Sequence, residues 1–321
     1  MSNVVTAPIT FKTKTLFAAV EATYDTAAAI AAGNWAEARN LKITPYSNSV
    51  VDRNIDFGGK GRMAGLSTIP FVKLTFDVGL APSGTAGTAP KWGTLLLGAG
   101  FAETVVATTS VTYNLVSKNE KSLTLAYGDG NDKHIITGAR GTVQFKLDAN
   151  GIPLMSYEFT GHYLAPVPNS GGTALPTADK TGWMVEQLVD RRYTTGSINT
   201  GSAVPVAFKS FMANIAQSIK SVEYPGPQSE VLIDDRAPTA EFQLLAPART
   251  TLDPDALITN STFINASVVH GVGAGKVAAL NTKGRFTGYD KVDLDGFLGY
   301  KLDMQLEATS AANDEFSLVL T

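Results

Sequence analysis

The acidic stretch DKVDLDGFLGYKL, residues 290–302, comes closest to a ligand-binding motif. Calcium loops carry oxygen ligands at alternate positions, a glycine at position six and a bidentate acid at position twelve. When Asp293 and Asp295 occupy positions three and five, Lys291 falls at position one. Leu302 then falls at position twelve. Because a cation and an apolar side chain stand where ligands are needed, the stretch predicts a tight turn and not a calcium site.

Histidine, the commonest general base and metal ligand, occurs only three times. His134, His162 and His270 lie far apart in the sequence and show no ligand spacing such as HxxxH. The glycine-rich GGKGR at 58–62 lacks the GxxxxGK[ST] pattern of a phosphate-binding loop, and no helix-forming sequence follows it. The sequence has no G-x-S-x-G elbow and no dinucleotide fingerprint. We therefore expect no enzyme, no cofactor and no metal.

Two hairpins of the same kind indicate which elements build the fold. Apolar and polar residues alternate in 140–163 on both sides of Asn150-Gly151, and they do so again in 287–308 around Asp295-Gly296. Alternation is typical of half-buried strands. Asn-Gly or Asp-Gly between two such runs predicts a hairpin with a type I′ turn, in which both central residues have positive φ.

Helical patterns are few and short. After Pro90, four apolar residues follow at helical spacing: Trp92, Leu95, Leu96 and Ala99. DPDALI, at 253–258, predicts a second short helix at the matching place in the second half. Residues 166–180 are rich in Pro, Gly, Ser and Thr and predict a linker. We expect a mainly β chain with two tandem antiparallel β-sandwich or β-barrel domains, at 1–165 and 181–321, each with a short flanking helix.

Composition bears on partners more than on chemistry. Of 321 residues, 44 % are hydrophobic and only 17 % are charged, with a net charge of −3 and no cysteine. No basic excess points to nucleic-acid recognition. Low charge fits either a neutral polar surface or burial against copies of the same chain, and both readings remain open. We expect no signal peptide at the N-terminus and no membrane segment, because the most apolar stretch, LLLGAGFAETVVA, is too short to span a bilayer.

Several motifs occur in an order that resembles the tail tube (major tail) proteins of long-tailed bacteriophages. The chain departs from the family pattern at Asp25, where a glycine is expected. The resemblance covers most of residues 15–165, and its motifs are Glu21 to Thr26, Pro90 to Thr104, Val111 to Tyr113, Lys121 to Thr124, Asp129-Gly130 and Gly138 to Gly141.

The resemblance implies a structural virion protein. Such proteins form rings whose inner strands join, and the rings stack into a hollow tube that delivers the genome into the bacterial host. Family members with one tube domain form six-membered rings, so a chain with two domains implies a trimeric ring with pseudo-sixfold symmetry, with a hexamer as the alternative. The implied partners are other copies of the chain, the tape measure, tail terminator and distal tail proteins, and double-stranded DNA passing through. The implied location is the virion tail, with the host cytoplasm during assembly.

Two sets of residues are candidates for roles in such a tube. DNA must slide through the lumen without binding to its wall, which favours a neutral to acidic lining. Acids on the long strands are therefore candidate lumen residues: Asp77, Asp148, Glu158, Asp303 and Glu307. The long stretch 47–70 has little periodicity, which predicts a segment that contacts an adjacent ring or subunit, with charged residues Asp52, Arg53, Asp56, Lys60 and Arg62. The alternative function is a virion-associated β-sandwich module that binds glycans or a host receptor.

Overall fold

The computed structural model of the chain describes residues 12–55, 60–61, 63–226 and 229–321. Within these residues the fold is mainly β, with antiparallel sheets and two α-helices of six residues each. The predicted fold class is confirmed at this level. Two single turns of 3₁₀-helix, η1 (Ala32–Asn34) and η2 (Gly171–Thr173), complete the helical structure of the described residues.

The strands and helices fall into two halves, residues 12–180 and 181–321. The first half contains β1 (Thr15–Val20), β2 (Trp35–Ala36), β3 (Arg39–Ser47), β4 (Val50–Val51), β5 (Leu66–Ser67), β6 (Phe71–Gly79), α1 (Gly93–Gly98), β7 (Phe101–Val106), β8 (Ser110–Leu115), β9 (Leu123–Gly128), β10 (Asp132–Asp148), β11 (Leu154–Tyr163) and β12 (Val167–Pro168). The second half contains β13 (Thr194–Asn199), β14 (Ala203–Val206), β15 (Phe208–Asn214), β16 (Gln217–Glu223), β17 (Ser229–Arg236), β18 (Thr239–Leu245), α2 (Pro254–Thr259), β19 (Ile264–His270), β20 (Ala278–Leu294), β21 (Phe297–Leu306) and β22 (Phe316–Leu320).

Both halves pair their strands in the same order. In the first half the order is β1–β9–β10–β11–β6–β3. In the second half it is β13–β19–β20–β21–β18–β15. The long strands β10 and β20 have 17 residues each, and α1 and α2 follow the corresponding strands β6 and β18. A tandem duplication predicts this agreement in strand order.

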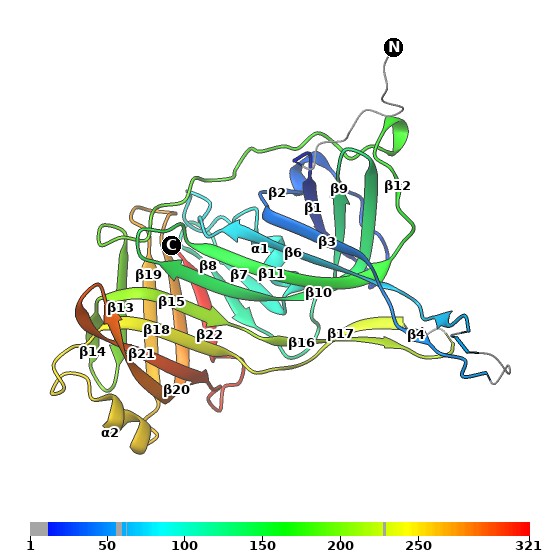
Figure 1. Ribbon diagram of the computed structural model, residues 1–321. Helices are drawn as coiled ribbons and strands as arrows, with labels where there is room; N and C mark the ends of the chain where they lie inside the picture. Colours follow the sequence, from blue (N-terminus) through cyan, green and yellow to red (C-terminus); the bar gives the residue numbers. More distant parts are fainter. Residues whose placement is uncertain (1–11, 56–59, 62, 227–228) are drawn as a thin grey trace, which may run out of the picture.

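The halves share one sheet. Because β10 pairs with β15, an eight-stranded inner sheet runs β3–β6–β11–β10–β15–β18–β21–β20 through the whole molecule (Figure 1). A second junction joins β8 to β22. The predicted linker at 166–180 contains the short strand β12, which pairs with the start of β10. The predicted boundaries therefore divide the chain but not the sheet.

The core lies between the inner sheet and the strands that cover it. Phe145 of β10 stacks on Phe316 of β22 with 4.9 Å between ring centroids, so the two halves share aromatic packing. The predicted helix α1 and the two residues that flank it present four fully buried side chains to this core: Trp92, Leu95, Leu96 and Ala99. Trp92 Nε1 donates to the Ala81 carbonyl oxygen at 2.7 Å, which satisfies its only polar atom.

The two predicted hairpin turns differ. Asp295 and Gly296 both have positive φ, 58° and 89°, between the paired residues Leu294 and Phe297, so this type I′ turn is confirmed. At the first hairpin only Asn150 has positive φ, at 62°, so the type I′ prediction is wrong there. The last residues paired between β10 and β11 are Lys146 and Leu154, so the connection is longer. Within it the Gly151 N–H donates to the Asp148 carbonyl, and the backbones of Asn150 and Gly151 also bond to Val189 of another segment.

Each half also extends a hairpin between the last two strands of its pairing order, from β3 to β6 in the first half and from β15 to β18 in the second. Residues 48–70 carry β4 and β5, and β16 and β17 form the corresponding hairpin in the second half. Both project away from the sheets on the same side of the molecule (Figure 1). We call these the first arm (48–70) and the second arm (215–238).

Candidate assembly surfaces

The junction between β10 and β15 shows how one half of this fold joins another. The two strands pair antiparallel from Gln144 opposite Asn214 to Asp148 opposite Ser210. One face of the junction is apolar, with Phe145 beside Ala213 and both fully buried. A strand edge of the first half is therefore closed by main-chain pairing to the second half.

The strands that correspond to this junction have free edges elsewhere in the molecule. By pairing order, β20 corresponds to β10 and β3 corresponds to β15. Among the described residues, β20 pairs beyond residue 284 only with β21, and β3 pairs only with β6. The inner sheet thus ends in β20 at one edge and β3 at the other, and these strands correspond to the two strands of the β10–β15 junction. Unpaired strand edges of this kind favour association.

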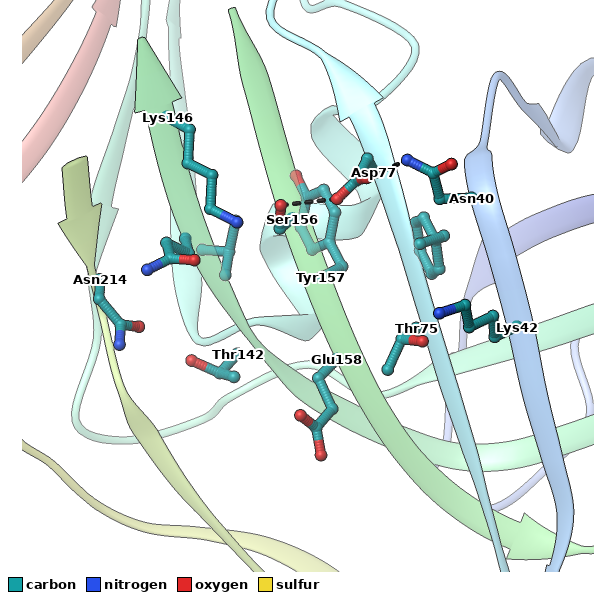
Figure 2. A pocket seen from close by; sticks show the side chains of 13 residues that line it. Asn40, Lys42, Thr75, Asp77, Thr142, Lys146, Ser156, Tyr157, Glu158 and Asn214 are labelled. Carbon is teal, nitrogen blue, oxygen red and sulfur yellow. Dashed lines mark hydrogen bonds between the residues drawn. The ribbon is translucent and has the colours of Figure 1, made fainter. Parts of the chain in front are cut away.

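Along the inner sheet, alternate side chains form one continuous polar face. In the first half this face has a cavity of about 410 Å³ lined by residues from β3, β6, β10, β11 and β15 (Figure 2). Asp77 is fixed there, because its carboxylate accepts from Asn40 Nδ2 at 2.7 Å and from Ser156 Oγ at 2.6 Å. The polar face continues in the second half, where Glu241 pairs with Lys301 at 3.1 Å.

Four of the five predicted lumen acids lie on this polar face. Asp77 and Glu158 line the cavity in Figure 2, and Asp148 is exposed at the end of β10. Asp303 on β21 lies 3.5 Å from Lys301. Glu307 follows β21 at the edge of the face and forms an ion pair with Arg285. The structure therefore spreads these acids along one surface and does not gather them at one point.

Lysines share the polar face, and sequence reasoning missed them. Lys42 and Lys146 line the same cavity as Glu158, and Lys301 lies between Glu241 and Asp303. Strand alternation was the available signal, since Lys146 and Asp148 are two residues apart on one strand. Interspersed lysines and acids make the face close to neutral in charge.

Of the charged residues predicted on the first arm, the structure describes three. Asp52, Arg53 and Lys60 are exposed, while Asp56 and Arg62 lie outside the described residues. The arm also exposes large apolar side chains that the prediction did not include: Val50, Val51, Leu66 and Ile69 are each more than half exposed. Because exposed apolar clusters are typical of contact sites, the first arm is a candidate contact surface.

A buried carboxylate connects three of the motifs that carry the family resemblance. Glu21 accepts hydrogen bonds from Ser122 Oγ at 2.6 Å and from Thr124 Oγ1 at 2.9 Å. It also accepts from the backbone N–H groups of Gly138 and Asp25, at 2.9 and 3.0 Å. Gly138 has positive φ at a bulge in β10, which brings its N–H toward the carboxylate. The role of Glu21 is therefore structural.

Arg140 holds the second arm against the first half. Its guanidinium donates to the Val231 carbonyl at 2.7 Å and to Glu230 at 3.0 Å, both on β17. It also stacks over the ring of Tyr24, whose hydroxyl accepts from the Val231 N–H at 2.6 Å. Burial of Tyr24 raises the pKa of its hydroxyl to about 12, so it stays neutral at physiological pH.

The three histidines lie in separate environments. His162 contacts Asp25 at 2.7 Å, and His270 Nδ1 lies 2.8 Å from Thr194. Burial lowers the pKa values of His134 and His270 and favours their neutral forms. Over the part of the chain that the structure describes, no three His, Asp or Glu residues are grouped as a metal site would require. The two α-helices described are far too short to cross a bilayer.

Comparison with known proteins adds no relative. No protein-family model and no curated protein matches the chain.

Proposed function

We propose that the chain is a tail tube protein of a long-tailed bacteriophage, in which copies join edge to edge into rings and the rings stack into a tube for DNA. The observation that carries the proposal is the pair of free edges. β20 and β3 correspond to the strands of the β10–β15 junction, so a second copy can repeat that junction with its β3 against β20. Such a head-to-tail contact generates a ring when its rotation closes.

The repeated pairing order supports the trimer as the symmetry of the ring. If the β10–β15 and β20–β3 junctions rotate the halves by similar angles, each chain contributes two steps around the ring. Six steps, as in rings of one-domain family members, then require three chains. The inner sheets of three chains would form a continuous wall whose polar face lines the lumen.

The character of the polar face fits the passage of DNA. Each phosphate contact with lysine or arginine releases counterions and adds affinity, so a strongly basic wall would retain the duplex. Here Glu158 lines the same cavity as Lys42 and Lys146, Asp148 lies two residues from Lys146 on β10, and Lys301 forms ion pairs with Glu241 and Asp303. A near-neutral wall that holds few free cations lets DNA slide. The protein acts without catalysis, cofactor or metal in this proposal.

Electron microscopy of purified protein tests the proposal directly. We expect rings or tubes, with a mass of three chains per ring in native mass spectrometry. Rings of six chains would contradict the trimer, and featureless monomers would contradict the tube.

A proline at the β20 edge tests the junction. Next to a two-residue hairpin, the residues flanking the turn bond to each other, so the N–H groups of Lys291 and Asp293 point away from β21. Lys291→Pro should therefore abolish rings and leave a folded monomer, because proline removes an edge donor without breaking the β21 ladder. Lys291→Ala is the matched control and should assemble normally. Normal rings from the proline variant would exclude this edge as the junction.

A further inference from the structure

A segment of the chain covers one end of the inner sheet in the first half. We call residues 183–190, which precede β13, the strap. Val189 of the strap is 2 % exposed, accepts from the Asn150 N–H at 2.7 Å and donates to the Gly151 carbonyl at 3.0 Å. Glu186 lies against Gly79, leaving no room for a Cβ there, and pairs with Arg39 at 2.5 Å. The strap thus covers the Asn150-Gly151 part of the turn between β10 and β11, while Ile152 of the same turn is 46 % exposed.

The corresponding end of the second half is bare. The Leu80 N–H donates to the Pro153 carbonyl at 2.9 Å, and the Ala246 N–H donates to Leu298 at 3.0 Å, so Pro153 and Leu298 occupy matching positions. Pro153 is buried, whereas Leu298 is 56 % exposed. Beside it, Phe297 is 68 % and Leu245 is 44 % exposed. These three side chains, the bare end, form an apolar patch at the β20–β21 turn.

We propose that the bare end binds the residues that precede β1 of a second copy of this chain. The strap precedes β13, and β13 corresponds to β1 because each is the outermost strand of the shared pairing order. Counted along the paired strands, Thr15 corresponds to Thr195, which places Ile9 at the position of Val189. The inference rests on the proposed ring, and it adds a second contact at each junction between chains.

The chemistry of the proposed occupant matches the bare end. Residues 2–11, SNVVTAPITF, contain no charged side chain and four large apolar ones, Val4, Val5, Ile9 and Phe11. Burying Phe297 and Leu298 removes apolar surface from water, which is the usual driving force for such contacts. When β3 of one copy pairs with β20 of another, β1 of the first copy lies in the same half as that β3. The segment before β1 of the first copy then lies on the same side of the junction as the bare end of the other copy.

Cysteine crosslinking tests the contact in the full chain, which has no cysteine of its own. Ile9→Cys protein and Leu298→Cys protein are mixed, assembled and mildly oxidised. Only a contact between chains can give a disulfide-linked dimer. Val106→Cys, exposed on the β7–β8 turn, replaces Leu298→Cys in the matched control. We expect about tenfold more dimer from the first mixture than from the control, because a docked segment has a high effective concentration at its site.

The outcomes separate this inference from the proposed function. Rings that form without excess Ile9–Leu298 crosslinks would overturn the inference and leave the ring standing. Failure of the unmodified protein to form rings would overturn both. As a second measurement, Leu298→Asp should weaken ring assembly while the far-UV circular dichroism stays unchanged, and Val106→Asp should assemble normally. Normal assembly of Leu298→Asp would also contradict the contact.

Discussion

The two halves of the molecule share a pairing order but differ in what covers them. In the first half the β10 edge pairs with β15, the strap covers part of the β10–β11 turn, and Arg140 holds the second arm. In the second half β20 beyond Gly284 pairs with no strand other than β21 among the described residues, although α2 packs against β20, and Phe297 and Leu298 are exposed. The second half therefore completes the first half, and in the proposed ring another copy of the chain would complete the second half.

Arg140 and Arg285 illustrate this difference at one position. Arg140 lies opposite Thr160 and Arg285 lies opposite Gln305, at corresponding places of the two long hairpins. The Arg140 side chain is 10 % exposed and binds the second arm. The Arg285 side chain is 40 % exposed and pairs with Glu307 instead. One position thus serves as an internal clamp in the first half and as a surface residue in the second.

The largest effect on stability is expected at Glu21, which has no counterpart in the second half, where Gly201 stands at the corresponding position. Glu21→Ala leaves Ser122, Thr124 and two backbone N–H groups without their acceptor, which should cost about 3 kcal/mol or more in the free energy of unfolding. Urea denaturation measures it. Gly201→Ala is not a suitable control because Gly201 has φ of 121°, so Thr200→Ala serves instead and should change stability by less than about 0.5 kcal/mol. A loss at Glu21 no larger than at Thr200 would contradict the structural role.

The next largest effect is expected from the substitution of Arg140, compared with the same substitution of Arg285. Arg140→Met removes a buried cation from Glu230 and Val231 and should lower the free energy of unfolding by about 2 kcal/mol. Arg285→Met removes a half-exposed ion pair and should cost less than about 1 kcal/mol in the monomer. Thermal unfolding of both variants below the concentration of assembly measures the difference. Equal losses would show that the halves are not distinguished at this position.

A smaller effect, which depends on pH, is expected at Asp314 near the start of β22. Burial alone would raise the pKa of this carboxyl, but hydrogen bonds from Lys283 and Thr309 outweigh burial and lower the pKa to about 2. Because the folded pKa is depressed, its contribution to stability is present above the unfolded value near 3.9 and is lost as pH falls toward 2.

Asp314→Asn tests this dependence. The variant should be less stable by about 1 kcal/mol at pH 7. Its stability should also fall less steeply than that of the unmodified chain between pH 4 and pH 2. Denaturant titrations at several pH values measure both quantities. Parallel pH profiles for the two proteins would exclude a special role for this carboxyl.

The smallest effect on stability is expected from Glu158 and Asp303, two acids at corresponding positions of the two halves, on β11 and β21. Glu158→Lys should change the free energy of unfolding by less than about 0.5 kcal/mol, because the side chain is exposed on the polar face. If that face lines the lumen, tubes of the Glu158→Lys, Asp303→Lys variant should retain DNA more strongly at low salt than unmodified tubes. Glu223→Lys combined with Asp235→Lys, two exposed positions on the second arm, gives the same change in charge and is the matched control. Equal DNA retention by the two variants would remove the polar face from the lumen.

Much of the fold could be predicted from patterns along the chain. Alternation predicted the long hairpin strands, and helical spacing predicted α1 with its four buried residues. The Asp295-Gly296 turn was also correct, since its geometry depends on two neighbouring residues alone. The Asn150-Gly151 turn was not, because a strap nearly 40 residues away bonds to it, and no local pattern reports that contact.

The candidate surfaces were predictable only in part. Strand alternation placed Asp77 and Glu158 on long strands but did not show that Lys42 and Lys146 share their face, because facing requires the register between strands. The clamp of Arg140 on Glu230 joins residues 90 positions apart and was not foreseen. Such contacts depend on how the hairpins pack.

By itself, the sequence determined the secondary structure of this protein, its antiparallel class and the places where hairpins turn, since alternation, glycine and asparagine act over a few residues. Only the tertiary structure decided which edges stay open. A strand edge is closed or free according to whether a distant strand reaches it with its hydrogen-bonding groups in register. β10 and β20 have equal lengths and similar hairpins, yet β10 has β15 beside it and β20 does not, and that difference carries the proposed assembly.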